Sequence, residues 1–203
     1  MKKHTLIILS MFVCGLAAHG QKVQAVAARQ QESFLGNPQA RKLIDNFKGR
    51  GFTQAAFIPE GTQTYTGKDA SGDVNLSLIT YHLTDKKKNA IDVAIFTDNR
   101  TKESTVWAEN EKEVFKVTGN AITSSPQKTA PSTNATAKSA GDCLQQFIKA
   151  GGPQSCGSCV SCVNNCFKKK YKWQKISCAV GNCSGSCWSC VKSVYGFIVC
   201  VFD

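Results

Sequence analysis

Short runs of hydrophobic residues alternate with polar residues along positions 52–122. These runs are rich in Thr, Val, Ile, Phe and Tyr and end at Gly, Asp or Asn, which is the pattern of β-strands joined by turns. Within residues 91–95 the alternation has a period of two, which predicts one packed face and one more exposed face. We therefore expect an antiparallel meander sheet with a helix on one side. The predicted strands are Val74 to Leu83, Ala90 to Thr97, Ser104 to Ala108 and Val114 to Val117.

A helix is predicted just before the sheet. Residues 39–48 carry three apolar side chains at helical spacing, and Asn37 and Pro38 before them are favoured at a helix start. Two glycines end the helical pattern. Together with the strands, this helix predicts a small α+β domain over residues 28–122.

The first 27 residues have the organisation of a secretory signal peptide. Two Lys precede an apolar run over residues 6–18, which is shorter than the roughly 20 residues of a permanent membrane span. Small residues suit cleavage after Gly20 or after Ala27. Cys14 lies inside the apolar run behind large residues that do not suit a lipoprotein site, so we expect it to leave with the signal. Export places the other Cys in an oxidising compartment, where thiols pair into disulfides.

Residues 123–140 contain no aromatic residue and no Val, Leu or Ile, and are mostly Ser, Thr, Ala and Pro. Such a segment buries too little apolar surface to order itself, which predicts a disordered linker. Proteases cut preferentially in exposed linkers. We expect a processing region at Lys138, Ser139, Ala140 and Gly141.

The remaining residues, 141–203, form a Cys-rich module that holds ten of the 11 Cys. The module has seven Lys and two Asp, and therefore a net charge of +5. Below about 80 residues one hydrophobic core rarely suffices, and small proteins add covalent staples. We expect disulfides among all ten Cys of the module: Cys143, Cys156, Cys159, Cys162, Cys166, Cys178, Cys183, Cys187, Cys190 and Cys200.

The Cys-rich module contains an internal repeat. Residues 157–163 match residues 185–191 at six of seven positions. The Cys in and around both copies recur every three or four residues, which is the spacing of one helix face. Two antiparallel helices with facing Cys stripes predict a small all-α hairpin stapled by disulfides. The spacing leaves the pairing itself open.

Three other uses of these Cys stay open. The spacing over residues 156–166 is that of bacterial iron–sulfur ligands, although Phe167 stands where Pro is expected and the signal lacks a twin Arg. Two C-x2-C pairs suit zinc, but the module has no His. Thiol–disulfide exchange needs a thioredoxin-like βαβ context, which the sequence lacks. Because disulfides use all ten Cys, we expect no metal and no other cofactor.

Basic and aromatic residues alternate over residues 167–175, which hold five Lys and three aromatics. Lys is attracted to anionic headgroups, while Trp and Tyr favour the membrane interface. Residues 194–202 add an apolar run that either enters the membrane or forms the core of the module. The alternative for the basic segment is a solvated connection between helices. The residues expected to bind a membrane are Lys168, Lys169, Lys170, Tyr171, Lys172, Trp173, Lys175, Trp188 and Phe197.

Charge and composition narrow the functional classes. The chain has 25 Lys and Arg against 14 Asp and Glu, and its net charge of +11 attracts polyanions. The basic segment lacks Arg for bidentate recognition of bases or phosphates, so we do not expect a nucleic-acid partner. The sequence has no nucleophile triad, no His-based metal set and no glycine-rich phosphate loop, and His82 is expected to be a packing or surface residue. We do not expect an enzyme.

The order of these parts resembles the halocin-like bacteriocin precursors. The resemblance rests on a Sec-type signal, an α+β segment, a processing region and a ten-Cys module with the runs at residues 156–159 and 183–187. Members of that family release a disulfide-rich antimicrobial peptide from the C terminus, and their N-terminal portion is a candidate immunity protein. The resemblance implies a secreted bacteriocin precursor, whose cationic peptide acts at the anionic membrane or envelope of related bacteria. Its partners would be its own N-terminal domain and the export and processing proteases.

A second class of function stays open. In this class the two modules stay joined, and the Cys-rich module binds an envelope polymer without killing the cell. The protein would then be a secreted binding or structural protein.

Overall fold

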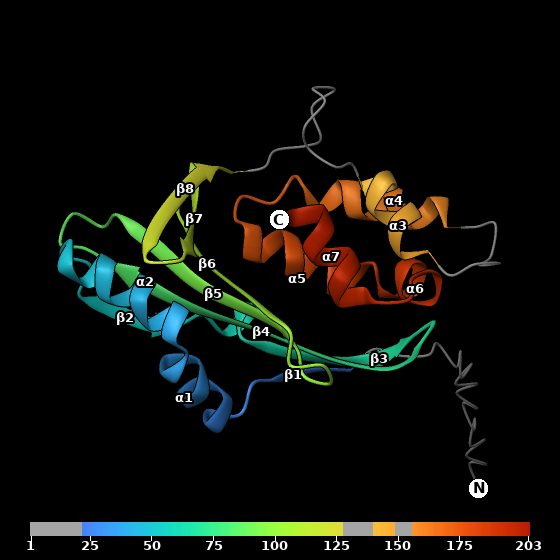
Figure 1. Ribbon diagram of the computed structural model, residues 1–203, viewed down its shortest axis with the longest axis horizontal. Coiled ribbons are helices and arrows are strands. Elements are labelled where there is room, and N and C mark those ends of the chain that lie inside the picture. The colour runs from blue at the N-terminus through green and yellow to red at the C-terminus, as the bar shows by residue number, and fades with distance from the viewer. Residues whose placement is uncertain (1–21, 128–139, 149–155) are drawn as a thin grey trace, which may run out of the picture.

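The computed structural model describes residues 22–127, 140–148 and 156–203. These residues form three layers, with two helices on one face of an antiparallel sheet and a group of short helices on the other (Figure 1). Residues 1–21 of the predicted signal peptide, which include Cys14, lie outside the described residues. The predicted fold class, an α+β domain followed by a disulfide-rich helical module, is confirmed.

The sheet has eight strands, and all of their pairings are antiparallel. The strands are β1 (Lys22–Ala25), β2 (Gln54–Phe57), β3 (Gln63–Asp69), β4 (Gly72–Thr84), β5 (Ala90–Asp98), β6 (Ser104–Glu109), β7 (Glu113–Thr118) and β8 (Ala121–Pro126). Their order is β1-β3-β4-β5-β6-β7-β8, and β2 pairs with the second half of the long strand β4. In the middle of the sheet, Leu78 of β4 lies between Gln63 of β3 and Phe96 of β5.

One face of the sheet is covered by the helices α1 (Ala28–Gly36) and α2 (Pro38–Gly49). The start of α2 follows the sequence prediction. The Asn37 side chain accepts hydrogen bonds from the backbone N–H groups of Gln39 and Ala40 at 3.0 and 3.1 Å, and Pro38 needs no such partner. A short 3-10 helix, η1 (Pro59–Gly61), lies between β2 and β3.

Both faces of the sheet are buried, which corrects the prediction of one packed face and one more exposed face. On the face of α1 and α2, Ile79 and Val93 belong to one hydrophobic core. On the other face, Leu78 and Phe96 belong to a second core that continues into the Cys-rich module. The prediction failed because polar residues such as Asp92 on this second face look solvent-facing in the sequence, whereas Asp92 is only 3% exposed.

The Cys-rich module covers this second face with short helical segments (Figure 1). In the described residues they are α3 (Ala140–Phe147), α4 (Gly157–Cys166), α5 (Lys172–Asn182), α6 (Ser184–Cys187), the 3-10 helix η2 (Trp188–Cys190) and α7 (Val194–Phe202). The apolar run over residues 194–202 is therefore a helix, and its side chains Phe197, Ile198 and Val201 are buried in the shared core. Of the two roles left open for this run, the folded chain uses it as core.

All ten Cys of the module are paired, and each disulfide lies within the module. Four disulfides are nested and join α4 and its N-cap to the antiparallel segment 178–190, whereas the fifth joins α3 to α7. The stapled helical hairpin is confirmed, with α3 and α7 added to it. The pairs are Cys156–Cys190, Cys159–Cys187, Cys162–Cys183, Cys166–Cys178 and Cys143–Cys200.

The two copies of the repeat differ in structure. The first copy lies in the continuous helix α4, whereas the second is divided between α6 and η2. Cys159 and Cys187 occupy the same position of the two copies and are bonded to each other. The middle of the disulfide ladder therefore falls on equivalent positions of the repeat.

The predicted linker is shorter in the structure than in the sequence analysis. Residues 123–126 belong to β8, which pairs with β7, because backbone pairing in an edge strand does not require apolar side chains. Ala140 and Gly141 of the predicted processing region begin α3, and Ala140 is fully buried. Lys138 and Ser139 lie outside the described residues.

The nesting of the disulfides predicts that they contribute unequally to the free energy of unfolding. Replacing both Cys143 and Cys200 with Ala should lower the free energy of unfolding by about 2–5 kcal/mol, because this bond closes the outermost loop, of 57 residues, which the inner bonds leave open. Replacing both Cys159 and Cys187 should cost less chain entropy, because the bonds on either side still restrain the same loop. Urea denaturation of the two double variants measures the difference. An equal or reversed order would contradict this account of the ladder.

Candidate functional site

The candidate functional site is the interface between the sheet and the Cys-rich module. The second face of the sheet and the module share one hydrophobic core, in which Leu78 and Trp107 of the sheet lie with Ile176 and Phe197 of the module. Within this apolar contact, several polar groups of the sheet bind α5, η2 and α7.

Glu109 at the end of β6 binds the first turn of α5. Its carboxylate accepts hydrogen bonds from the backbone N–H groups of Lys172 and Trp173, the latter at 2.9 Å, and from the Trp107 indole N–H at 2.8 Å. Gln127 donates a fourth bond from its side-chain amide. The first turn of α5 has no acidic residue of its own, so a carboxylate from the sheet satisfies its free N–H groups and faces the positive end of the helix dipole.

The Glu109 side chain is 0% exposed, and burial raises the pKa of its carboxyl, whereas the four donated hydrogen bonds oppose that rise. A buried carboxylate without partners would be strongly destabilising. The four donors supply the compensation, and two of them are present only when the module lies on the sheet.

Asp92 of β5 forms a second polar contact beside Glu109. One carboxylate oxygen accepts a hydrogen bond from the Trp173 indole N–H at 2.8 Å, and the other lies 2.6 Å from Nδ1 of His82 on β4. His82 therefore has a carboxylate partner on the neighbouring strand of the sheet. Trp173 is fixed at both its backbone and its ring by two carboxylates of the sheet.

Lys172 extends from the same turn of α5 into the interface. Its ammonium group lies 2.7 Å from the Asp203 carboxylate and 4.7 Å from the centre of the Trp107 ring. Asp203 also binds Lys116 of β7 at 2.7 Å. Burial lowers the pKa of Lys172 to about 8, although Asp203 favours its charged form.

Two tyrosines add polar contacts near the rim of the shared core. The hydroxyl of Tyr65 on β3 lies 2.9 Å from the Ser177 hydroxyl of α5. The hydroxyl of Tyr195 on α7 lies 3.1 Å from the Thr105 hydroxyl of β6, and its ring stacks on Phe96 at 5.3 Å between centroids. Burial raises the pKa of both tyrosines.

A close approach of backbone to side chain marks the contact of β3 with η2. Gly67 of β3 lies beneath the Trp188 ring, and a Cβ atom at this glycine would lie only 2.5 Å from a ring carbon. Just beyond, the backbone N–H of Ala70 donates a hydrogen bond to the carbonyl of Val191 at 3.1 Å. Because only a residue without a side chain fits at position 67, the Trp188 ring packs directly on the backbone of β3.

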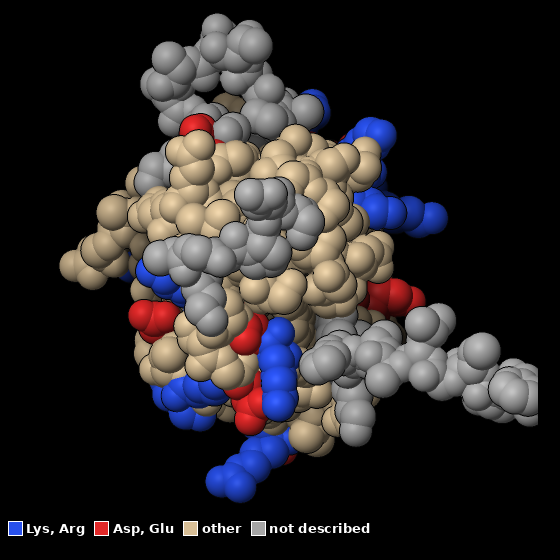
Figure 2. All heavy atoms as spheres, turned by 90° about the vertical axis from the view of Figure 1, so that its right-hand side faces the viewer, with Lys and Arg blue, Asp and Glu red and all other residues tan. Residues whose placement is uncertain are grey.

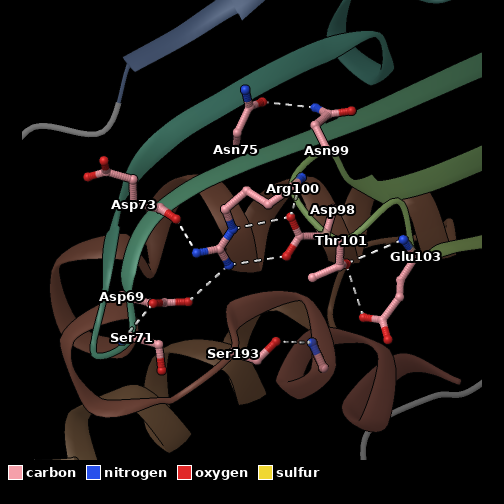
Figure 3. A network of polar contacts seen from close by, with 11 residues as sticks. Asp69, Ser71, Asp73, Asn75, Asp98, Asn99, Arg100, Thr101, Glu103 and Ser193 are labelled. Carbon is pink, nitrogen blue, oxygen red and sulfur yellow. Dashed lines mark hydrogen bonds and ion pairs between the residues drawn. The ribbon is translucent and has the colours of Figure 1, made fainter.

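An arginine network supports the end of the sheet that receives this part of the module (Figure 3). Arg100 binds Asp98 at 3.1 Å and Asp69 at 3.5 Å, and it donates a further bond to the Asp73 carbonyl. Burial alone would raise the pKa of Asp98, but hydrogen bonds and charge from Arg100 lower it. The network ties the β3–β4 turn to the turn after β5, next to the segment in which Ser193 caps α7 by accepting from the Gly196 N–H at 3.0 Å.

The structure divides the residues predicted to bind a membrane into two groups. Lys168, Lys169 and Lys170 are exposed, and Lys170 pairs with Glu111 of the sheet at 2.5 Å. Tyr171 is half-buried. The other five predicted residues are buried in the docked module: Lys172, Trp173, Lys175, Trp188 and Phe197. Figure 2 shows the consequence on one side of the molecule, where the module above carries few charges and most Lys, Arg, Asp and Glu side chains lie over the sheet below.

The cysteines that suggested an iron–sulfur site are each bonded to a different partner in the second half of the module. Within the described residues, no group of three or more His, Cys, Asp or Glu side chains is placed to hold a metal ion. None of the helices in the described ranges has the length and apolar character to cross a membrane. Five disulfides are typical of proteins from oxidising compartments.

Sequence analysis missed the sheet's side of this interface. Glu109, Asp92 and Gly67 carry the main contacts, and none was selected as a site residue. For the two carboxylates, the position in the strand is the one signal in the sequence, because Asp92 interrupts a strongly apolar strand and Glu109 ends one. A buried carboxylate at such a position needs a partner, and here the partner lies more than 60 residues away in the chain.

No protein-family model, curated protein or solved structure matches this chain.

Replacing Glu109 with Gln should lower the free energy of unfolding by about 2 kcal/mol or more, because hydrogen bonds to a charged group are lost and an amide N–H group faces backbone N–H donors. Glu111→Gln is the matched control, since Glu111 is exposed and its surface pair with Lys170 is worth about 1 kcal/mol at most. Urea denaturation of both variants at neutral pH measures the difference. Equal effects of the two changes would remove the special role assigned to Glu109.

The buried amine of Lys172 predicts a pH dependence of stability. Between about pH 8 and 10.5 the unfolded chain binds a proton at Lys172 that the folded chain does not, so the free energy of unfolding should rise with pH in this window. The slope from this group approaches about 1.4 kcal/mol per pH unit. It should be absent in Lys172→Met, whereas the contribution of Lys175, whose pKa burial also lowers, remains. Denaturation curves at several pH values test this, and identical slopes in both proteins would refute it.

Proposed function

We propose that this chain is the precursor of a secreted antimicrobial peptide, in which the Cys-rich module is the active part and the sheet domain is its holder. One observation carries the proposal: all five disulfides close within residues 143–200, and none of them reaches the sheet. A single cut between Gln127 and Ala140 would leave a covalently closed module that noncovalent contacts alone hold on the sheet.

The burial of the interfacial residues supports this division of roles. A cationic peptide that acts on an anionic membrane needs Lys, Trp and Tyr at its surface. In the docked chain the sheet covers Trp173, Trp188 and Lys172. The precursor would be inactive for this reason, and release would expose the membrane-binding face. The same coverage suits a role of the sheet domain in protecting the producing cell, because a module that binds the sheet cannot present these residues to a membrane.

Secretion agrees with the disulfides and with the signal-like N terminus. The structure favours one of the two cleavage bonds left open. Cleavage after Ala27 would remove β1, which pairs with β3, and the buried Val26. Cleavage after Gly20 would keep both. We therefore propose that the signal is cleaved after Gly20.

A second function is favoured by the shared core. Because the sheet and the module bury apolar side chains against each other, the uncut chain is also suited to remain one body. It would then be a secreted protein that binds an envelope polymer through exposed lysines such as Lys168 and Lys169. Neither candidate function uses an enzymatic step.

Intact mass and growth inhibition distinguish the two. The culture supernatant of a producing strain should contain a species close to residues 141–203 that gains ten alkyl groups only after reduction, and this fraction should inhibit related bacteria. For a controlled comparison, a specific protease site is inserted within residues 128–139 of the full chain. The uncut protein should not inhibit growth, whereas the module separated from the cut protein should inhibit it.

Two results would count against the antimicrobial role. One is a secreted product that stays uncut and binds cell walls without loss of viability, which would support the envelope-binding candidate. The other is a separated, fully disulfide-bonded module that inhibits none of the strains related to the producer.

A further inference from the structure

We propose that the sheet domain is a folding template that selects the five disulfide pairs of the Cys-rich module. This role goes beyond holding the finished module, and it does not depend on whether the released module is toxic. It follows from where the sheet contacts the module relative to the cysteines.

Every disulfide joins the first half of the module to the second half. Each has one Cys within residues 143–166 and its partner within residues 178–200. Correct pairing therefore requires one half to be presented to the other in a single register. Ten Cys allow roughly 900 pairings, and the helical spacing recurs in both halves, so a shift of one turn brings wrong partners together.

The contacts of the sheet with the module engage the second half next to its cysteines. Ser177, which binds Tyr65, directly precedes Cys178. Trp188, which seats on Gly67, follows Cys187. The carbonyl of Val191, which accepts from Ala70, follows Cys190.

The two ends of the second half are held in the same way. Glu109 fixes the first turn of α5, the helix that carries Cys178. Thr105 and Phe96 hold Tyr195 in α7, the helix that carries Cys200. Most cysteines of the second half therefore lie next to a contact that fixes their position on the sheet. The helices α3 and α4 then have only to pack against this positioned half.

The sheet is able to form before the disulfides. With α1 and α2 it has a hydrophobic core of its own on the other face, and the sequence from 22 to 127 contains no Cys. From β3 to β8 each strand pairs with the next strand in the chain, and contacts that are local in sequence form fast. This part is also synthesised first.

The sheet supplies position and no oxidising power. For each bond, two Cys thiols lose two electrons and two protons, and a disulfide oxidant such as glutathione disulfide accepts them and leaves as two thiols. Exchange through mixed disulfides lets wrong pairs reopen until the register set by the sheet is reached.

The test is oxidative refolding of the reduced, denatured full chain in glutathione buffer, with the pairs identified by peptide mass spectrometry. The wild type should regain the five native pairs. In Gly67→Val the three atoms nearest to the new Cβ all belong to the Trp188 ring, and valine is favoured in a strand, so the sheet should keep its fold and lose a docking point. The yield of the native isomer should fall by roughly an order of magnitude as other pairings compete.

The matched control is Gly36→Val, at the end of α1, on the face of the sheet away from the module. No atom lies within 4 Å of a Cβ at Gly36, so this variant should refold like the wild type. A second control denatures Gly67→Val with its disulfides intact. It should refold in good yield, because the register is already fixed by covalent bonds.

A measurement on the wild type makes the test independent of any variant. Hydrogen exchange and thiol trapping during refolding should find β4 and β5 protected while the module still has free thiols. Native pairing at wild-type rate and yield in Gly67→Val would overturn the proposal, and so would a sheet that gains protection only after all five bonds are made. Neither result bears on growth inhibition by the finished module.

Discussion

The hydrogen bonds from the start of α5 to the buried Glu109 carboxylate are the central contact between the sheet and the Cys-rich module. They bring a charge from the sheet to a helix that has no acidic residue in its first turn, and they fix this helix at the point where the Lys-rich segment leads into it. Neither partner is stable in the interior alone, since a buried carboxylate needs donors and buried N–H groups need an acceptor. The apolar contacts around Glu109 exclude the water that would otherwise solvate the carboxylate and the N–H groups. These contacts can therefore form only where the two groups are paired with each other.

The charged residues of the interface change the meaning of the chain's high positive charge. A basic segment suggests a surface that meets anionic partners directly. Here Lys172 lies over Trp107 and against Asp203, whereas Lys168, Lys169 and Lys170 of the same segment are exposed. Most of the aromatic side chains and some of the lysines of the module are therefore buried in the docked protein. Under the release that we propose, these side chains would become exposed, and the sheet would control whether they can reach a membrane.

Covalent and noncovalent forces are divided between the two parts. The module is closed by its own five disulfides, whereas its attachment to the sheet consists of hydrogen bonds, ion pairs and a shared core. Cutting the chain between Gln127 and Ala140 would not open either part. The same division is compatible with the two proposed roles of the sheet, which are to position the module during folding and to release it after a cut.

The sequence alone determined the local elements and their chemistry. Strand alternation, the Asn37–Pro38 helix start and the Cys spacing of three and four depend on neighbours in the chain. They led to the strands, the helix and the disulfide-bonded hairpin that form, although the alternation gave the wrong burial for the second face of the sheet. Even the hairpin ladder follows from helical periodicity, although its pairs do not.

Tertiary structure decided what covers the second face of the sheet, and with it the site. Asp92 and Glu109 look like solvent-facing residues in a strand, and Trp173 and Trp188 look like membrane anchors, until the module brings them together. The requirement for glycine at position 67 arises only from the tertiary contact with the Trp188 ring. These contacts join residues 64 to 121 positions apart, and no local pattern encodes them because the free energy of burying a charge or a ring depends on the partner across the interface.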